Sequence, residues 1–421
     1  MASKWLMSFL LTIISFTAHG QIIESISFAG IKKTKPRFLE RFLVSSVGEP
    51  LDSTRLEADK TRLTYLEPIS SVRYEVSLSA DKATVIFHCT EFYSILPIFS
   101  MGGINENFWL QAGATDVNLQ GSNEKLLFYY QYYDRHSIII DYQKPWIGES
   151  DWGYGFNLTR WGTVEPLYFE NGSTEYNYDN TSLGANLYYH LNFTDRLVFN
   201  ATIFEERYQK RELPGLEGAP ELANLRKSLF KVIFNRNKVK SNYFMQDGYS
   251  LQVNSEAVFP LNHQANNFYI TFAELRFFKS IGKTNNPIGN LAQRLKFGLS
   301  SNENSPFAPF VLDSYVNIRG VGNRVDRGTG MVVWNSEYRH TLWNASKVSA
   351  QLVAFSDLGS WRNPGGGISD FVQSRNIQWF AGGGLRLILK PVYNAVLRFD
   401  FGKDLLHENM SGFVFGVGQY F

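Results

Sequence analysis

From about residue 96 to the last residue, the sequence repeats one pattern, in which apolar and polar side chains alternate over short stretches separated by turns. Near the end, for example, Leu397 and Phe399 alternate with Arg398 and Asp400. A period of two residues is that of a β-strand with one apolar and one polar face. The chain is therefore mainly β, and both a soluble sandwich and a transmembrane barrel produce such alternation.

Division of this region at its turns predicts sixteen strands. Residues 93–421 then provide about twenty residues for each strand with its connection, which suits an antiparallel transmembrane β-barrel. The longer connections (162–178, 208–227, 300–329 and 358–377) all fall at one end of this barrel, and the short turns fall at the other. The predicted strands are 97–103, 109–117, 124–133, 137–144, 152–161, 179–190, 196–207, 228–236, 247–258, 267–279, 292–299, 330–341, 347–357, 378–389, 393–402 and 411–421.

The composition supports the barrel and narrows the class of protein. Aromatic residues make up 15% of the chain, with 34 Phe and 22 Tyr, which favours strands over helices. The 41 basic and 39 acidic residues are balanced, which argues against a nucleic-acid-binding surface. No apolar run is long enough to predict a transmembrane helix. Aromatic residues also stand at strand ends, where membrane barrels carry aromatic girdles: Tyr132, Trp146, Trp152, Trp161, Trp334, Trp361 and Trp379.

Residues 1–20 have the features of a secretory signal peptide. Lys4 supplies the positive start, and Trp5–Phe16 is an apolar stretch too short to span a bilayer comfortably. Ala18-His19-Gly20 offers the small residues of a cleavage site, so we expect the mature chain to begin at Gln21.

Residues 21–92 differ from the rest and predict a small domain of order β-α-α-β-β. The single cysteine, Cys89, excludes an intramolecular disulfide and a cysteine-based metal site, and we expect it to be buried in this domain's sheet. Two helices on a three-stranded sheet leave one strand edge free, to which an extended client peptide can add. The predicted elements are a strand that begins at Ile22 and ends at Gly30, helices over 36–45 and 53–66, the second capped by Asp52 or Ser53, and strands over 71–79 and 84–89.

The predicted connection 300–329 is polar, yet it contains the motif Ile318-Arg319-Gly320-Val321. A second motif, Phe355-Ser356-Asp357-Leu358-Gly359, ends a later strand, and Glu337 lies on the strand between them. We therefore predict that the loop folds into a polar lumen, where Arg319 pairs with Asp357 and Glu337. The alternative is that this lock only completes folding of the barrel and takes no part in transport.

The last predicted strand, 411–421, places Phe413, Phe415, Val417 and Phe421 on one face. This aromatic ending resembles the C-terminal signature of bacterial outer-membrane barrels. Glycines occur on both strands that would close the barrel, and glycine weakens strand pairing, so we predict a lateral seam that can open. The alternative is that these glycines make room for large lumen side chains. The predicted seam residues are Gly102, Gly103, Gly412, Gly416, Gly418 and Phe421.

Together, these motifs resemble those of the BamA/TamA-like superfamily of outer-membrane insertases and two-partner-secretion transporters, in a short form of the bacterial surface antigen type. The start of the small domain, Ile26-Ser27-Phe28-Ala29-Gly30, is typical of a POTRA domain. The two lumen motifs match the family's Val-Arg-Gly and Phe-x-Asp-x-Gly motifs, in which Val321 replaces the usual aromatic residue. Asn-Leu-Gln-Gly at 118–121 and Asp400-Phe401-Gly402 also fit the family pattern. A second departure is the single N-terminal repeat.

The resemblance implies a protein of the bacterial outer membrane, with its N-terminal domain in the periplasm. It would capture unfolded client chains and insert or export them through a gated, monomeric barrel, with the lipid bilayer and accessory lipoproteins as further partners. The alternatives are a dedicated exporter of one partner protein, and a passive pore or structural surface antigen. The sequence contains no Gly-x-Ser-x-Gly, His-Glu-x-x-His or P-loop motif, and its seven histidines are scattered. We therefore expect no enzyme activity and no catalytic, cofactor-binding or metal site.

Overall fold

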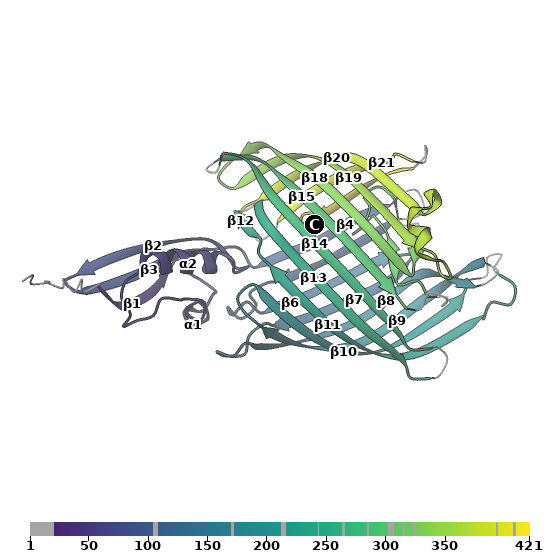
Figure 1. The fold of residues 1–421 in the computed structure, drawn as a ribbon, viewed down its shortest axis with the longest axis horizontal. Coiled ribbons are helices and arrows are strands. Elements are labelled where there is room, and N and C mark those ends of the chain that lie inside the picture. The colour runs from purple at the N-terminus through teal and green to yellow at the C-terminus, as the bar shows by residue number, and fades with distance from the viewer. Residues whose placement is uncertain are drawn as a thin grey trace, which may run out of the picture.

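The computed structural model consists of a small N-terminal domain and a large β-barrel arranged along one axis (Figure 1). The predicted signal peptide, residues 1–20, lies outside the described residues. Among the residues that are described, no helix is long and apolar enough to cross a membrane. The described residues are 21–103, 108–169, 172–211, 216–242, 244–262, 266–283, 286–301, 307–314, 316–322, 326–392, 395–406 and 410–421.

The N-terminal domain has the predicted order of elements. Its sheet has the order β1-β3-β2, with β1 parallel and β2 antiparallel to β3. Buried apolar residues such as Leu39, Leu63 and Phe87 form the core between this sheet and the helices, and Cys89 is buried among them. The elements are β1 (Ile22–Ala29), α1 (Pro36–Glu40), α2 (Ser53–Thr64), β2 (Ile69–Ser79) and β3 (Lys82–Glu91).

The two helices differ in how well the sequence predicts them. Asp52 caps α2 by accepting a hydrogen bond from the backbone N–H of Thr54 at 2.8 Å, as expected. Helix α1, in contrast, ends at Glu40 rather than at the predicted residue 45. The buried carboxylate of Asp59 accepts hydrogen bonds from the backbone N–H groups of Val44 and Ser45, at 2.5 and 3.1 Å. These bonds replace the helical ones and end α1 early.

The predicted sixteen-stranded antiparallel barrel is confirmed, and it closes through pairing of β4 with β22. A further short strand, β12 (Lys240–Asn242), pairs only with the start of β13. The barrel strands are β4 (Ile95–Gly103), β5 (Trp109–Asp116), β6 (Lys125–Tyr133), β7 (Arg135–Lys144), β8 (Trp152–Phe169), β9 (Gly172–His190), β10 (Asp195–Lys210), β11 (Leu222–Asn237), β13 (Met245–Pro260), β14 (Phe268–Lys283), β15 (Asn286–Ser300), β18 (Gly330–Asn344), β19 (Val348–Arg362), β20 (Ile377–Leu389), β21 (Val396–Asp404) and β22 (Ser411–Val417).

Two connections that the sequence predicted to be loops contain strand residues. The predicted loop 162–178 is almost wholly shared between β8 and β9, and the two ends of 208–227 belong to β10 and β11. These extensions rise on the side of the barrel away from the N-terminal domain (Figure 1). A separate cluster of buried side chains stabilises these extensions. Alternation of apolar and polar residues detects the lipid-facing part of a strand and therefore missed them. The cluster consists of Leu167, Tyr176, Tyr178, Tyr208 and Leu225.

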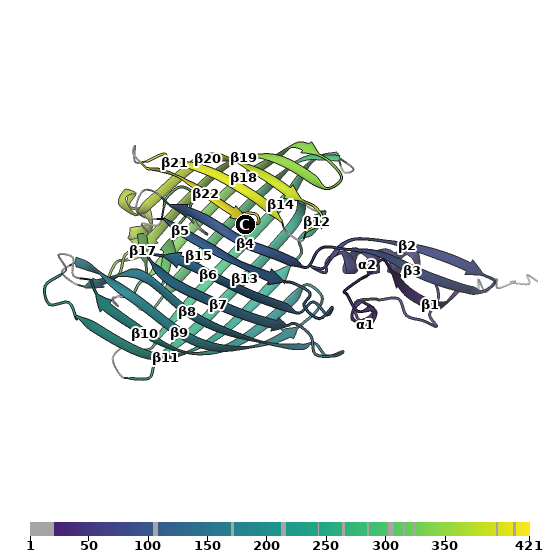
Figure 2. The same cartoon turned by 180° about the vertical axis from the view of Figure 1, so that it is seen from behind.

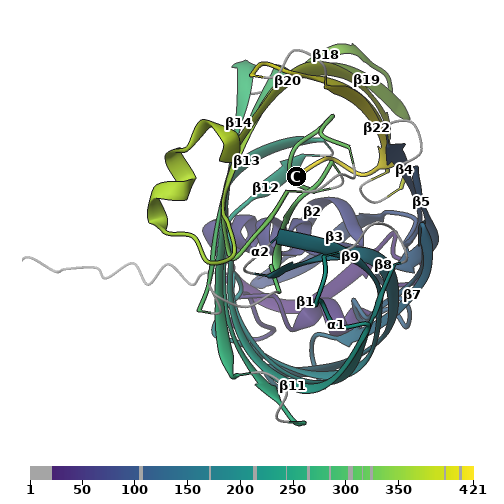
Figure 3. The same ribbon diagram turned by 90° about the vertical axis from the view of Figure 1, so that its right-hand side faces the viewer.

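The described parts of the 300–329 connection lie inside the barrel, as Figure 3 shows along the barrel axis. Two short strands there, β16 (Phe310–Leu312) and β17 (Asp326–Gly328), pair with each other. The next connection on this side carries two short helical turns, η1 (Ile368–Val372) and η2 (Ser374–Asn376).

The prediction of a terminal strand reaching residue 421 is wrong. Strand β22 ends at Val417, and Gly418 has a φ of +97°, a conformation that favours glycine. This turn carries the last residues into the lumen (Figure 3). Phe421 therefore does not share the outer face with Phe413, which is 51% exposed, because Phe421 itself is buried.

The N-terminal domain packs against the turns of the nearer barrel end. The Lys33 ammonium lies 2.7 Å from the Asp116 carboxylate, and the Asn118 amide donates to the Thr34 hydroxyl at 3.0 Å. The ring of Trp146 packs against Phe42 with a centroid distance of 5.2 Å. Polar and aromatic contacts therefore fix the domain on the barrel.

Candidate functional site

Arg319 lies at the centre of the lumen site and is fully buried. Its Nε and Nη2 donate to the two carboxylate oxygens of Asp357, at 2.8 and 2.9 Å, and its backbone N–H donates to the same carboxylate at 3.0 Å. Its Nη1 donates to Glu337. The structure thus brings together the arginine and the two carboxylates that the sequence selected. Arg319, Glu337 and Asp357 are called the lumen lock below.

Three further charged side chains, which the sequence did not assign to this site, surround the lumen lock. Arg339 donates from Nε to Glu337 at 2.5 Å. Arg386 donates to both carboxylate oxygens of Asp400, at 2.7 and 3.1 Å, and to Glu337 at 3.4 Å. All of these side chains are fully buried in their ion pairs. Each of the three buried carboxylates therefore has at least one arginine partner, which is what burial of a carboxylate requires.

Glycines allow the loop tip to sit this close to the barrel wall. Gly320 has a φ of +95°, and a Cβ there would lie 2.7 Å from the backbone oxygen of Gly402 on β21. A Cβ on Gly359 would lie 2.4 Å from the side chain of Ile318. Gly320, Gly359 and Gly402 thus make room for the motif, and a larger residue at any of these positions must displace the loop.

Aromatic and apolar residues complete the seat of the motif. The Arg319 guanidinium lies over the ring of Phe355 at 3.7 Å from its centroid, a cation–π contact. Ile318 and Val321 are buried in one apolar cluster that also includes Phe380 of β20. Val321 therefore fills a packed position even though it is not aromatic.

The last three residues form a second connection to the lumen lock. The Tyr420 hydroxyl donates to the backbone oxygen of Ser314 in the loop at 3.1 Å, and its ring lies 4.5 Å from the Arg319 guanidinium. Arg339 donates to the backbone oxygen of Phe421 at 3.1 Å. Residues 419–421 are called the inner tail below, and they join β22 to both the loop and the lock.

The closing seam between β4 and β22 is short. Within the described residues, four residue pairs form it, from Phe413 opposite Gly103 to Gly416 opposite Ser100. Figure 2 shows β4 between β22 and β5. A hydrogen bond from the Ser100 hydroxyl to the backbone oxygen of Phe415, at 3.1 Å, adds to this seam.

The glycines predicted for the seam have different surroundings. A Cβ on Gly102 would lie 3.1 Å from the Trp109 ring, and one on Gly416 would lie 2.9 Å from the Ser100 hydroxyl and 3.1 Å from Arg398. Gly412 lies opposite Gly402 on β21. Two of these positions thus leave room for neighbouring side chains, as the alternative interpretation expected, while Gly418 and Phe421 lie beyond the end of β22.

The barrel residues match a known family model. Residues 118–421 match the Omp85 superfamily domain. The chain belongs to the Omp85 superfamily. A sixteen-stranded barrel of this superfamily implies an outer-membrane location. No curated protein sequence matches the chain.

Solved structures share the fold of this Omp85 protein at low sequence identity. BamA from Haemophilus ducreyi lacking POTRA domains 1–3 is 15% identical, with a TM-score of 0.55, covering 94% of this chain and 84% of that chain. CdiB from Acinetobacter baumannii is 14% identical, with a TM-score of 0.60, covering 95% and 74%. CdiB from Escherichia coli is 12% identical, with a TM-score of 0.63, covering 95% and 77%.

Proposed function

We propose that this protein inserts client polypeptides into the outer membrane or exports them across it. The proposal rests on the seam between β4 and β22, in which the described residues form only four pairs. A strand pair this short is the part of the barrel wall that opens at the lowest free-energy cost. An opened seam exposes two strand edges, and a client strand can pair with them.

The N-terminal domain, which has the order of a POTRA domain, would face the periplasm and capture the client. In the described part of the domain, β2 pairs with β3 alone. The outer edge of β1, in contrast, is partly occupied by a bridge between Ile22 and Pro50. An extended client chain can therefore add to the open edge of β2 through backbone hydrogen bonds.

A cavity between the domain and the barrel could receive a client chain after it leaves β2. Its volume is about 550 Å³, and its lining includes Tyr65 and Phe92 on the domain side and Phe278, Tyr420 and Phe421 on the barrel side. Beyond it, the inner tail and the loop that carries Arg319 lie inside the barrel (Figure 3). A client that passes through the lumen would pass these segments, whereas a client that enters the membrane would leave through the seam.

The principal alternative is a dedicated exporter of one partner protein, and a passive pore or structural antigen is the third candidate. Depletion of this protein in its host, followed by proteomics of the outer membrane and medium, separates them. Loss of many barrel proteins would mean a general insertase, and loss of one or a few exported proteins would mean a dedicated exporter. An unchanged proteome would contradict both forms of the proposal.

A disulfide across the seam tests the moving part directly. Met101 of β4 lies opposite Phe415 of β22, so cysteines at both positions tether the seam. The matched control tethers Ala114 of β5 to Phe128 of β6, which also lie opposite each other. The native Cys89 stays out of the reaction because burial, with a smaller effect of Glu91, raises its thiol pKa to about 11.

The expected result is loss of client insertion or export with the seam tether, restoration by a reductant, and full activity with the control tether. An active protein with the seam tether would show that the seam stays closed during transport. The lumen lock would then act in barrel folding or in passage through the lumen.

A further inference from the structure

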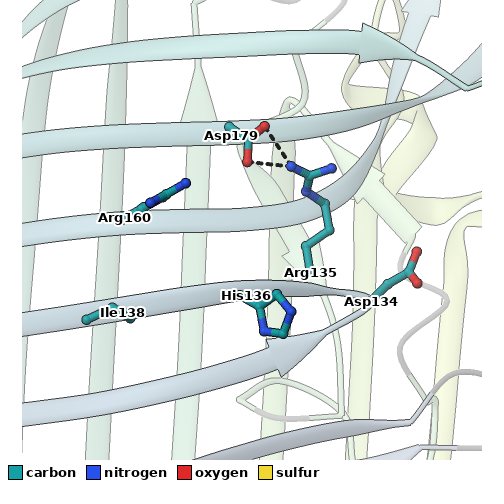
Figure 4. Close-up of a pocket in the computed structure, with 6 residues that line it drawn as sticks. All are labelled: Asp134, Arg135, His136, Ile138, Arg160 and Asp179. Carbon is teal, nitrogen blue, oxygen red and sulfur yellow. Dashed lines mark hydrogen bonds and ion pairs between the residues drawn. The ribbon is translucent and has the colours of Figure 1, made fainter.

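Two neighbouring hairpins of the barrel differ in length, and the height difference between them forms a step on the outer surface. The hairpin between β6 and β7 turns at Asp134, whereas the neighbouring β8 and β9 continue to Phe169 and Gly172. At the foot of this step lies a pocket of about 500 Å³ (Figure 4). Its lining residues are Asp134, Arg135, His136, Ile138, Arg160 and Asp179.

The pocket lies on the outer face, at the upper border of the lipid-facing surface. Ile138 is 43% exposed and lies opposite Arg160, so both side chains point outward. The next outward pair toward the N-terminal domain is Ile140 and Leu158, and Leu158 is 48% exposed. The outer surface on the N-terminal-domain side of the pocket is therefore apolar. Arg160 is the first charged side chain beyond this surface, and this apolar surface is called the floor of the pocket below.

Both carboxylates of the pocket are already paired with arginines. Arg135 donates from Nη2 to the two oxygens of Asp179, at 2.6 and 2.7 Å (Figure 4). Its side chain crosses β8 at Gly162, where a Cβ would lie 3.2 Å from it. Asp134 lies 3.0 Å from the Arg211 guanidinium, outside the pocket. Neither carboxylate therefore neutralises Arg160.

One arginine of the pocket can still receive an anion. Across the part of the chain that the structure describes, no ion pair or hydrogen bond engages the Arg160 guanidinium, which is exposed. The His136 ring is held in place, because its Nδ1 lies 2.6 Å from the Tyr130 hydroxyl and its ring lies 5.4 Å from that of Tyr132. Figure 4 shows this ring pointing away from Arg160, so Arg160 is the group of the pocket that can receive an anion.

We propose that this pocket binds the phosphate headgroup of a lipid in the membrane leaflet distal to the N-terminal domain. The phosphate would accept hydrogen bonds from Arg160, whose planar guanidinium suits two phosphate oxygens. The acyl chains would lie along Ile138 and Leu158. The apolar floor favours a lipid over a soluble phosphate compound, because only a lipid covers both parts of the surface. The proposal does not depend on the transport function.

Native mass spectrometry of the full chain in detergent tests this site. The probe is dimyristoyl phosphatidic acid, and dimyristoyl phosphatidylcholine is the comparison lipid. We expect preferential binding of phosphatidic acid, weakened about tenfold by Arg160→Gln and largely kept by Arg160→Lys. The matched control is Arg226→Gln, because Arg226 is also exposed but pairs with Glu205 at 3.5 Å, away from the pocket.

Each result bears on the proposal. Equal binding of phosphatidic acid by wild type and Arg160→Gln, or an equal loss with Arg226→Gln, would overturn the site and leave only a general attraction between anionic lipids and the rim. Binding of inorganic phosphate as tight as that of the lipid would identify a free-phosphate site and overturn the lipid assignment. Heat-dependent mobility in gel electrophoresis reports whether each variant has folded, and Arg160→Lys retains the charge if Arg160→Gln does not fold.

Discussion

The two sides of this barrel are held together in different ways. On one side, β8 and β9 pair continuously from Trp152 opposite Tyr189 to Phe169 opposite Gly172. On the other, the described residues of β4 and β22 share only four pairs. Buried ion pairs occur on both sides, as between Lys227 and Glu206 on the long side, but the largest group is the lumen lock with Arg339, Arg386 and Asp400, and together with the inner tail it ties the loop to the barrel wall. If the seam opens as proposed, these ion pairs would help to hold the barrel together where its backbone ladder is shortest.

The largest effect is expected from removing the arginine of the lumen lock. Arg319→Ala leaves Asp357 and Glu337 buried with fewer partners, which costs about 3–5 kcal/mol of unfolding free energy. On the long side, Arg236 makes a similar bidentate contact, because its Nε and Nη2 donate to the two carboxylate oxygens of Asp195 at 2.9 and 2.7 Å. Its side chain, however, is 37% exposed. Arg236→Ala should cost at most about 1 kcal/mol. Denaturant titration of both variants in one detergent measures the difference.

Equal losses in the two variants would contradict this comparison. An Arg319→Ala variant with normal stability and normal transport would contradict both roles considered for the lumen lock, gating and folding of the barrel.

Amide hydrogen exchange should reveal the same asymmetry without any mutation. Peptides that cover 96–103 and 411–417 are expected to exchange roughly a hundredfold faster than those that cover 152–160 and 183–190, because local opening is easier where the ladder is short. The peptide 397–403 is an internal control, since each of its residues pairs with both β20 and β22. Uniform protection around the barrel would show that the seam is as stable as the rest of the wall.

A methyl group at the loop tip should have an intermediate effect. Gly320→Ala adds a Cβ 2.7 Å from the backbone of Gly402, on a residue with a φ of +95°. Gly148→Ala is the matched control, because Gly148 has a φ of +57° but no atom within 4 Å of a new Cβ. The control should lose about 1 kcal/mol from backbone strain alone, and Gly320→Ala should lose about 2–3 kcal/mol. Similar losses would mean that the loop tip adapts freely.

The smallest effect concerns the base of the N-terminal domain. Burial raises the pKa of Glu91, but hydrogen bonds from Thr34 and from the backbone N–H groups of Lys32 and Lys33 lower it more, so the net shift is downward. The stabilisation is therefore present above the ordinary glutamate pKa of about 4.3 and is lost as pH falls through the lower folded value.

Exchange of the amides of Lys32 to Thr34, corrected for intrinsic rate, should rise below about pH 4 in the wild type. In Glu91→Gln this additional pH dependence should be absent. An identical pH profile in both proteins would show that the carboxylate does not hold this segment.

Much of this fold could be predicted because its signals are local. The cap at Asp52 and the alternation of Leu397 to Asp400 depend on neighbouring residues only. The contact of Arg319 with Asp357 and Glu337 could be predicted because Arg319 and Asp357 lie in recognisable motifs and Glu337 lies on the strand between them. Each of these predictions needed only a short stretch of sequence.

The rest depends on which strands face one another across the lumen. Arg398 and Asp400 were visible as a charged strand face, but nothing in their sequence shows that Asp400 pairs with Arg386. The turn at Gly418 likewise requires a place in the lumen for Tyr420 and Phe421. Alternation along a strand identifies a face but not its neighbours, so the inner tail could not be foreseen.

The connection between the domain and the barrel has a mechanical consequence. Only residues 92–94 separate β3 from β4, and the backbone N–H of Tyr93 is bound to the oxygen of Pro391 at 2.9 Å. Three residues span at most ~10 Å, so the linker has little slack. A force applied to the domain is therefore transmitted to β4, which is one of the two strands that form the seam. If a client chain pulls on β2, as the proposed function requires, the same pull strains the seam.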